Sequence, residues 1–86
     1  MNAKLVKLES ISLGSRSVFI RPKDHWTDIV RVMQNKNPVT SQWHDPVILW
    51  MSGGVDAHYS TIEMADLMVE ALQEAKKRHE RWSREV

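Results

Sequence analysis

The chain lacks cysteine altogether, which excludes a disulfide framework, thiolate metal ligands and redox chemistry at cysteine. It also lacks a long apolar run, because the strongest one, Val47 to Met51, is far shorter than the roughly 20 residues that span a bilayer. The segment Met1 to Leu13 carries charges among its apolar positions, unlike the apolar region of a signal peptide. We therefore expect a cytoplasmic protein with no membrane segment.

An excess of charge of one sign is absent too. The 86 residues include 12 Lys and Arg against 11 Asp and Glu, a formal charge of +1, which does not indicate a polyanionic partner. Tryptophan is abundant by contrast, with four Trp beside one Phe and one Tyr. A single domain over residues 1–86 has a small core that cannot easily bury so many large rings. We expect some indole at a surface and a homodimer that buries additional area.

The N-terminal part of the chain is strand-like. The runs Lys4 to Leu13 and Ser17 to Arg21 flank a Gly-Ser turn and predict an antiparallel hairpin. Within the first run the apolar residues shift from even positions, Val6 and Leu8, to odd positions, Ile11 and Leu13, which predicts a bulge near Glu9 and Ser10.

The middle of the chain allows two interpretations. Apolar spacing typical of an amphipathic helix begins at Trp26, whereas the β-branched residues between Thr27 and Gln34 favour a strand. We adopt the strand, with the helix as the alternative. Residues 38–46 are expected to form a loop in which Trp43 is either an exposed contact residue or folds back onto the core.

Two further strands are predicted after this loop. The unbroken apolarity of Val47 to Met51 indicates a central strand covered on both faces, with Trp50 in the core. A Gly-Gly turn follows, and residues 55–59 predict a short return strand that completes a second hairpin.

The C-terminal part has the clearest pattern, that of an amphipathic helix from Thr61 to Trp82. A capping box at Ser60 to Glu63 begins it, and an apolar stripe follows one side. Ile62 and Val69 lie off this stripe and are candidate contacts with a second chain. The predicted fold is α+β, an antiparallel sheet of four or five strands in two hairpins with one long helix on one face.

The sequence contains no strong motif for catalysis, phosphate binding or metal binding. Ser52 to Asp56 is similar to the S-G-G-x-D-S phosphate-binding motif of ATP pyrophosphatases, but Ala57 replaces the second serine and the parallel sheet is missing. The four histidines lack diagnostic metal-ligand spacing, and no nucleophile stands beside a base. We therefore predict no catalytic residue, metal or cofactor, and an enzyme is the third hypothesis.

The end of the helix is basic. Such a segment can neutralise phosphates, with Trp82 stacking on a base, or it can simply complement the helix dipole, with Glu74 pairing to Arg78. The possible nucleic-acid contacts are Lys76, Lys77, Arg78, Arg81 and Arg84.

The segment from Val47 to Lys77 resembles small uncharacterised proteins of actinobacteria and their phages, which often end in a strand, a Thr-led cap and a similar helix. The resemblance implies an accessory or phage-encoded protein that acts by binding a host or partner protein. Our hypothesis is a non-enzymatic protein-interaction module, and the alternative is a nucleic-acid-binding protein. The predicted partner or dimer contacts are Trp26, Trp43, Ile62 and Val69.

Overall fold

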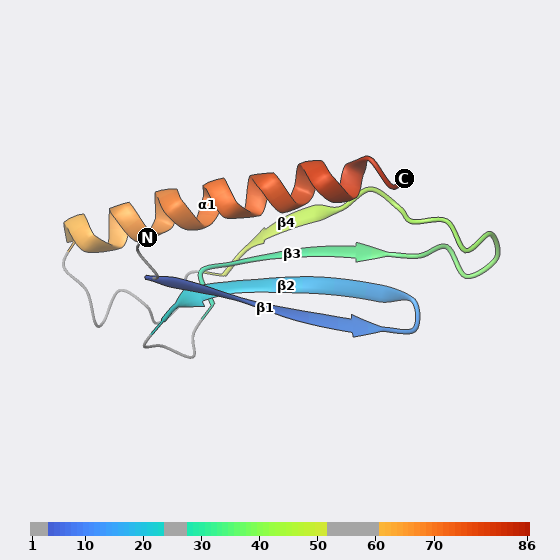
Figure 1. Ribbon diagram of the computed structural model, residues 1–86, viewed down its shortest axis with the longest axis horizontal. Helices are drawn as coiled ribbons and strands as arrows, with labels where there is room; N and C mark the ends of the chain where they lie inside the picture. Colours follow the sequence, from blue (N-terminus) through green and yellow to red (C-terminus); the bar gives the residue numbers. More distant parts are fainter. Residues whose placement is uncertain (1–3, 24–27, 52–60) are drawn as a thin grey trace.

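The computed structural model describes residues 4–23, 28–51 and 61–86, and within the helix it does not describe the side chains of Thr61 and Met64. The elements are β1 (Leu5–Ser12), β2 (Ser15–Pro22), β3 (Val30–Asn35), β4 (Val47–Trp50) and α1 (Thr61–Ser83) (Figure 1). The strands form one antiparallel sheet in the order β1-β2-β3-β4, and α1 packs on one face of it. The predicted α+β class, the first hairpin and the long helix are confirmed. Trp26, the Ser52–Asp56 motif, the return strand at 55–59 and the cap residue Ser60 lie outside the described residues.

The hairpin of β1 and β2 is regular. Leu5 lies opposite Pro22 and Ser12 lies opposite Ser15, with the register unbroken between them. The bulge that we expected near Glu9 and Ser10 is therefore wrong. The change in apolar parity needs no bulge because the residue that causes it, Ile11, is 78% exposed near the hairpin tip.

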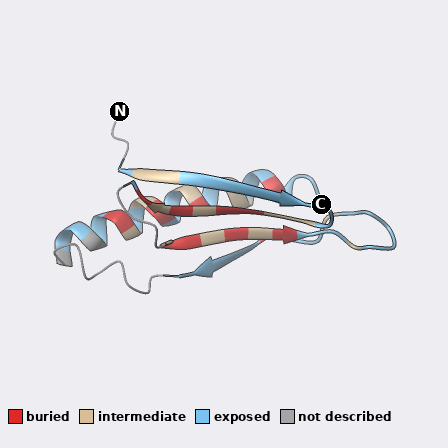
Figure 2. Cartoon of the chain, turned by 90° about the horizontal axis from the view of Figure 1, so that it is seen from below, coloured by how far each residue is buried: buried red, intermediate tan, exposed pale blue. Residues whose placement is uncertain are grey.

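The core lies between α1 and the two central strands (Figure 2). Val18 is opposite Val32 and Ile20 is opposite Val30, and all four side chains are fully buried. Burial of each such aliphatic side chain contributes about 1.5–3 kcal/mol, which explains why alternation of β-branched residues wins over helical spacing in this segment. The strand prediction is confirmed for Val30 to Gln34, whereas Asp28 and Ile29 precede the strand. From the helix, the core receives Leu67, Ala71, Ala75 and Trp82.

The strand β4 differs from its predicted place. It is an edge strand among the described strands, and all of its side chains are exposed. The prediction of a strand covered on both faces is wrong because the side chains of β4 are exposed on both faces, and among the described strands β4 pairs with β3 alone. Trp50 is 46% exposed, so its expected core position is wrong as well.

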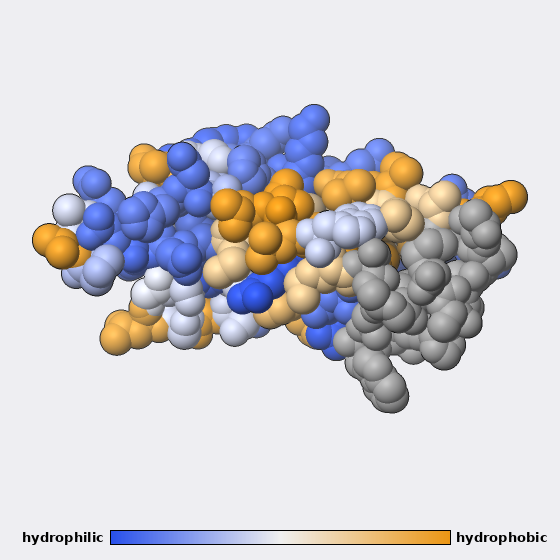
Figure 3. Space-filling view, turned by 180° about the vertical axis from the view of Figure 1, so that it is seen from behind, coloured by the Kyte–Doolittle hydropathy of each residue, from blue (hydrophilic) through white to orange (hydrophobic). Residues whose placement is uncertain are grey.

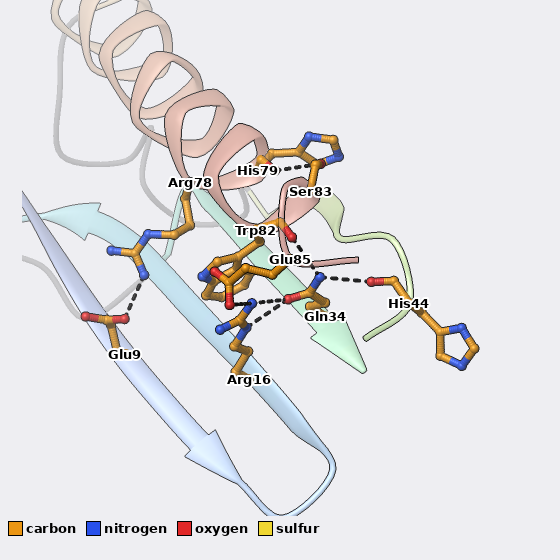
Figure 4. A network of polar contacts seen from close by, with 9 residues as sticks. All are labelled: Glu9, Arg16, Gln34, His44, Arg78, His79, Trp82, Ser83 and Glu85. Atoms are coloured by element: carbon orange, nitrogen blue, oxygen red, sulfur yellow. Dashed lines mark hydrogen bonds and ion pairs between the residues drawn. The ribbon is translucent and has the colours of Figure 1, made fainter. Parts of the chain in front are cut away.

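A polar cluster joins the sheet to the C-terminal end of α1 (Figure 4). The side chain of Gln34 is buried, its Oε1 accepts hydrogen bonds from Arg16, and its Nε2 donates to the carbonyl oxygens of His44 and Trp82. The Arg16 guanidinium lies 4.2 Å from the Trp43 ring centroid and 4.5 Å from that of Trp82. Trp43 thus folds back to a partly buried position at the end of the core.

Candidate interaction surface

The outer edge of β4 has no neighbouring strand among the residues that the structure describes. The Met51 N–H donates to the Ile29 carbonyl oxygen at 2.8 Å, which continues the register in which Trp50 lies opposite Val30. In an antiparallel ladder, the backbone N–H and C=O groups of successive residues alternate: those of one residue bond to the neighbouring strand, and those of the next point away from it. The N–H and C=O groups of Ile48 and Trp50 therefore point outward, away from β3.

The side chains around this edge are apolar. Ile48 and Trp50 lie on the helix-covered face of the sheet, opposite Val32 and Val30, and are 39% and 46% exposed. Figure 3, seen from behind, shows apolar side chains gathered on this side of the molecule. The apolar surface at the β4 edge consists of six exposed, uncharged residues: Val47, Ile48, Leu49 and Trp50 of the strand, Met51 after it, and Leu72 of α1. Leu72 lies on the side of the helix on which His79, two turns later, contacts the Pro46 carbonyl oxygen just before β4.

The opposite edge of the sheet, β1, is protected by charge. Lys7 Nζ lies 2.7 Å from Glu74 Oε1, and Arg78 Nη1 lies 2.7 Å from Glu9 Oε1, so side chains of α1 reach over this strand. Charged residues on an edge strand oppose pairing with another chain. The two edges thus differ, and only β4 combines free backbone groups with an uncharged surface in the described sheet.

Two of the predicted nucleic-acid contacts, Lys77 and Arg78, form ion pairs with carboxylates. A hollow of about 220 Å³ is lined by Lys7, Glu74, Lys77, Arg78 and Arg81. The expected pair between Glu74 and Arg78 is wrong, since Glu74 binds Lys7 and Lys77 and Arg78 binds Glu9 on β1. The Arg78 side chain is only 12% exposed. This arrangement weakens the nucleic-acid alternative because carboxylates already hold Lys77 and Arg78.

These ion pairs also predict how stability depends on pH. The hydrogen bond from Arg78 lowers the pKa of Glu9, and hydrogen bonds from Lys7 and Lys77 lower the pKa of Glu74, both from an ordinary value of 4.5. A carboxyl group whose pKa is lower in the folded state stabilises the fold above its unfolded pKa, and this contribution is lost as the pH falls through the folded value. We expect the free energy of unfolding, measured with urea from pH 7 to pH 3, to decrease in this acid range. The decrease should be smaller in the double variant Glu9→Gln/Glu74→Gln.

Glu80→Gln is the control for this measurement, since Glu80 is an exposed helix carboxylate without an ion pair in the described part of the chain. In this control, the free energy of unfolding should decrease between pH 7 and pH 3 by as much as in the native chain. A double variant with the native slope would contradict this role of the ion pairs.

The described members of the predicted contact set, Trp43, Ile62 and Val69, do not meet at one surface. Ile62 and Val69 are 75% and 54% exposed on the side of α1 turned away from the buried stripe. Trp43 lies near the C-terminal end of α1, where the Arg16 guanidinium contacts both the Trp43 ring and the Trp82 ring. The β4 edge was missed because its apolarity was interpreted as burial. Among the described strands, pairing in chain order leaves β4 at an edge.

Comparison of the chain with protein-family models, with curated proteins and with solved structures gave no match. In the described residues, no three or more acidic or histidine side chains gather in a way that could hold a metal ion. No helix in this part of the chain has the length and apolarity needed to cross a membrane.

Proposed function

We propose that the protein is a non-enzymatic interaction module that binds another protein by strand addition at the β4 edge. The observation that carries the proposal concerns Ile48 and Trp50, whose backbone groups point away from β3 and have no partner among the described residues. They lie within an apolar surface that carries no charge. An added strand gains affinity from main-chain hydrogen bonds and specificity from alternate side chains. An accessory or phage-encoded protein that acts by binding a partner is the biological role that fits this surface.

The chemistry of the surface defines the partner strand. Each added backbone hydrogen bond contributes about 0.5–1.5 kcal/mol net, so burial of apolar area must supply much of the affinity. Side chains of the added strand that point to the helix side meet Ile48, Trp50 and Leu72. The partner strand is therefore extended and apolar at alternate positions, with no acidic residue at its centre.

Fluorescence anisotropy tests this proposal with a labelled peptide that contains residues 47–51 flanked by lysines for solubility. We expect saturable, micromolar binding to dilute native protein. The variant Ile48→Pro removes an outward-facing N–H and leaves the hydrogen bonds to β3 in place, since Leu49 and Val47 make those. It should abolish binding of the peptide.

A matched control exists on the other edge. The Lys23 N–H donates to the Lys4 carbonyl oxygen, so even-numbered residues of β1 face β2 and the N–H of Ile11 points outward. The variant Ile11→Pro places the same residue type on the charged edge and should bind the peptide as the native chain does. Equal loss of binding in both variants, or no binding to the native chain, would contradict the proposal.

A further inference from the structure

We infer that the strand bound at the β4 edge is β4 of a second copy of this chain, paired antiparallel across a two-fold axis. The inference rests on the proposed function and specifies the partner. A two-fold contact brings the same surface of each copy together, so that surface must be complementary to itself. The β4 edge meets this requirement in register, in charge and in area.

The register follows from the positions of the backbone groups. In an antiparallel pair, residues directly opposite each other lie on the same face of the sheet and exchange both hydrogen bonds at every second position. With Leu49 opposite the partner subunit's Leu49, each Ile48 lies opposite a Trp50, and the outward groups of both residues in both copies form four hydrogen bonds. A shift that sets Ile48 opposite itself would place Trp50 opposite Pro46, which has no N–H to donate.

The charge of the edge permits this pairing. Residues 47–51 carry no ionisable side chain, so the antiparallel contact brings no like charges together. The β1 edge cannot do the same, because self-pairing there would have to displace or crowd Lys7, Glu9 and their helix partners. The favoured contact is therefore β4 with β4, which gives one continuous sheet with both helices on the same face.

The available area sets the expected strength. Complete burial of the exposed parts of the six residues of the apolar surface would remove at most roughly 500 Å² per chain, or about 1,000 Å² in a dimer, near the lower limit of a specific interface. Area of this size supports a reversible dimer in the micromolar range rather than an obligate one. The native chain should thus shift from monomer to dimer within an ordinary dilution series.

Cysteine cross-linking tests the register directly, because the chain has no cysteine of its own. In Leu49→Cys, the two Cα atoms of a non-hydrogen-bonded pair lie about 4.5 Å apart, within the range of a disulfide. In Ile48→Cys, the two equivalent Cα atoms are offset by two residues and lie about 8 Å apart, beyond that range. Under mild oxidation at micromolar concentration, we expect covalent dimer to form at least about tenfold faster in Leu49→Cys than in Ile48→Cys, since bridging requires Cα atoms within ~7 Å.

A third variant, Ile11→Cys, places a thiol on the β1 edge at a position that is 78% exposed, against 39% for Leu49, and measures cross-linking by random collision. Circular dichroism of each reduced variant checks that it is folded. Cross-linking of Leu49→Cys at the rate of Ile11→Cys would overturn the inference of a second copy. If the native chain still binds the peptide of residues 47–51 and Ile48→Pro abolishes that binding, strand addition holds with a different partner. If the peptide does not bind either, the proposed function fails as well.

Discussion

Replacing Trp82 with alanine is expected to lower the free energy of unfolding by about 3–5 kcal/mol, the usual cost of removing a buried Trp or Phe side chain. Trp82 is only 3% exposed and closes the core at the C-terminal end of α1. Its ring also contacts two guanidinium groups, those of Arg16 at 4.5 Å and Arg78 at 5.4 Å from the centroid. The truncation therefore removes core packing and two cation–π contacts together.

Urea unfolding followed by circular dichroism measures this effect. The control is Trp50→Ala, since Trp50 is 46% exposed on the edge strand and should cost less than about 1 kcal/mol in the monomer. If Trp82→Ala does not fold, Trp82→Phe keeps most of the ring packing and should be measurably less stable than the native chain. Equal stability of the Trp82→Phe variant and the native chain, or equal losses for Trp82→Ala and Trp50→Ala, would contradict the assigned role of Trp82.

Replacing Gln34 with leucine is expected to cost about 1–3 kcal/mol, the usual cost of leaving a buried polar group without a partner, although the substitution adds apolar surface to a buried site. Leucine removes the donor to the His44 carbonyl oxygen and the acceptor of Arg16, whereas the Trp82 carbonyl oxygen still accepts from the Glu85 N–H at 3.0 Å. Arg16 keeps an ion pair with Glu85 at 3.1 Å, which limits the loss at that group. The cost should therefore fall mainly on the carbonyl group of His44.

The same urea assay checks this prediction, with Asn35→Leu as the control because Asn35 is the exposed neighbour on the same strand. The control should change the free energy of unfolding by no more than about 0.5 kcal/mol. The double variant Gln34→Leu/Arg16→Leu should lose less than the sum of the two single variants, since their side chains share one interaction. A Gln34→Leu variant as stable as the native chain would show that the cluster does not hold the sheet to the helix.

Elements with strong local patterns could be predicted from the sequence. The stripe that includes Leu67, Ala71 and Ala75 has helical spacing over several turns, and α1 runs over Thr61–Ser83 where a helix from Thr61 to Trp82 was expected. The hairpin of β1 and β2 also follows from a local turn signal. In the third strand, alternation of Val30 and Val32 outweighed a competing helical spacing because both side chains meet α1.

Features that depend on distant contacts could not be predicted. Gln34 bonds to Trp82, which is 48 positions away in the sequence, and nothing near Gln34 indicates this partner. Likewise, the residues of β4 have the composition of a central strand, and only the structure shows that their side chains are exposed and that β3 is the one described strand paired with them. The candidate contacts Ile62 and Val69 were recognised as exposed, yet their distance from β4 along the surface depends on how the helix is rotated against the sheet.

Hydrogen exchange of individual backbone amides tests the central claim most directly, that the β4 edge accepts an added strand. The measurement compares dilute native protein with and without the lysine-flanked peptide of residues 47–51. The account predicts that the peptide slows exchange at Ile48 and Trp50, whose N–H groups point outward, and leaves Lys7, Glu9 and Ile11 on the β1 edge unchanged. Unchanged exchange at Ile48 and Trp50, or equal slowing along both edges, would contradict it.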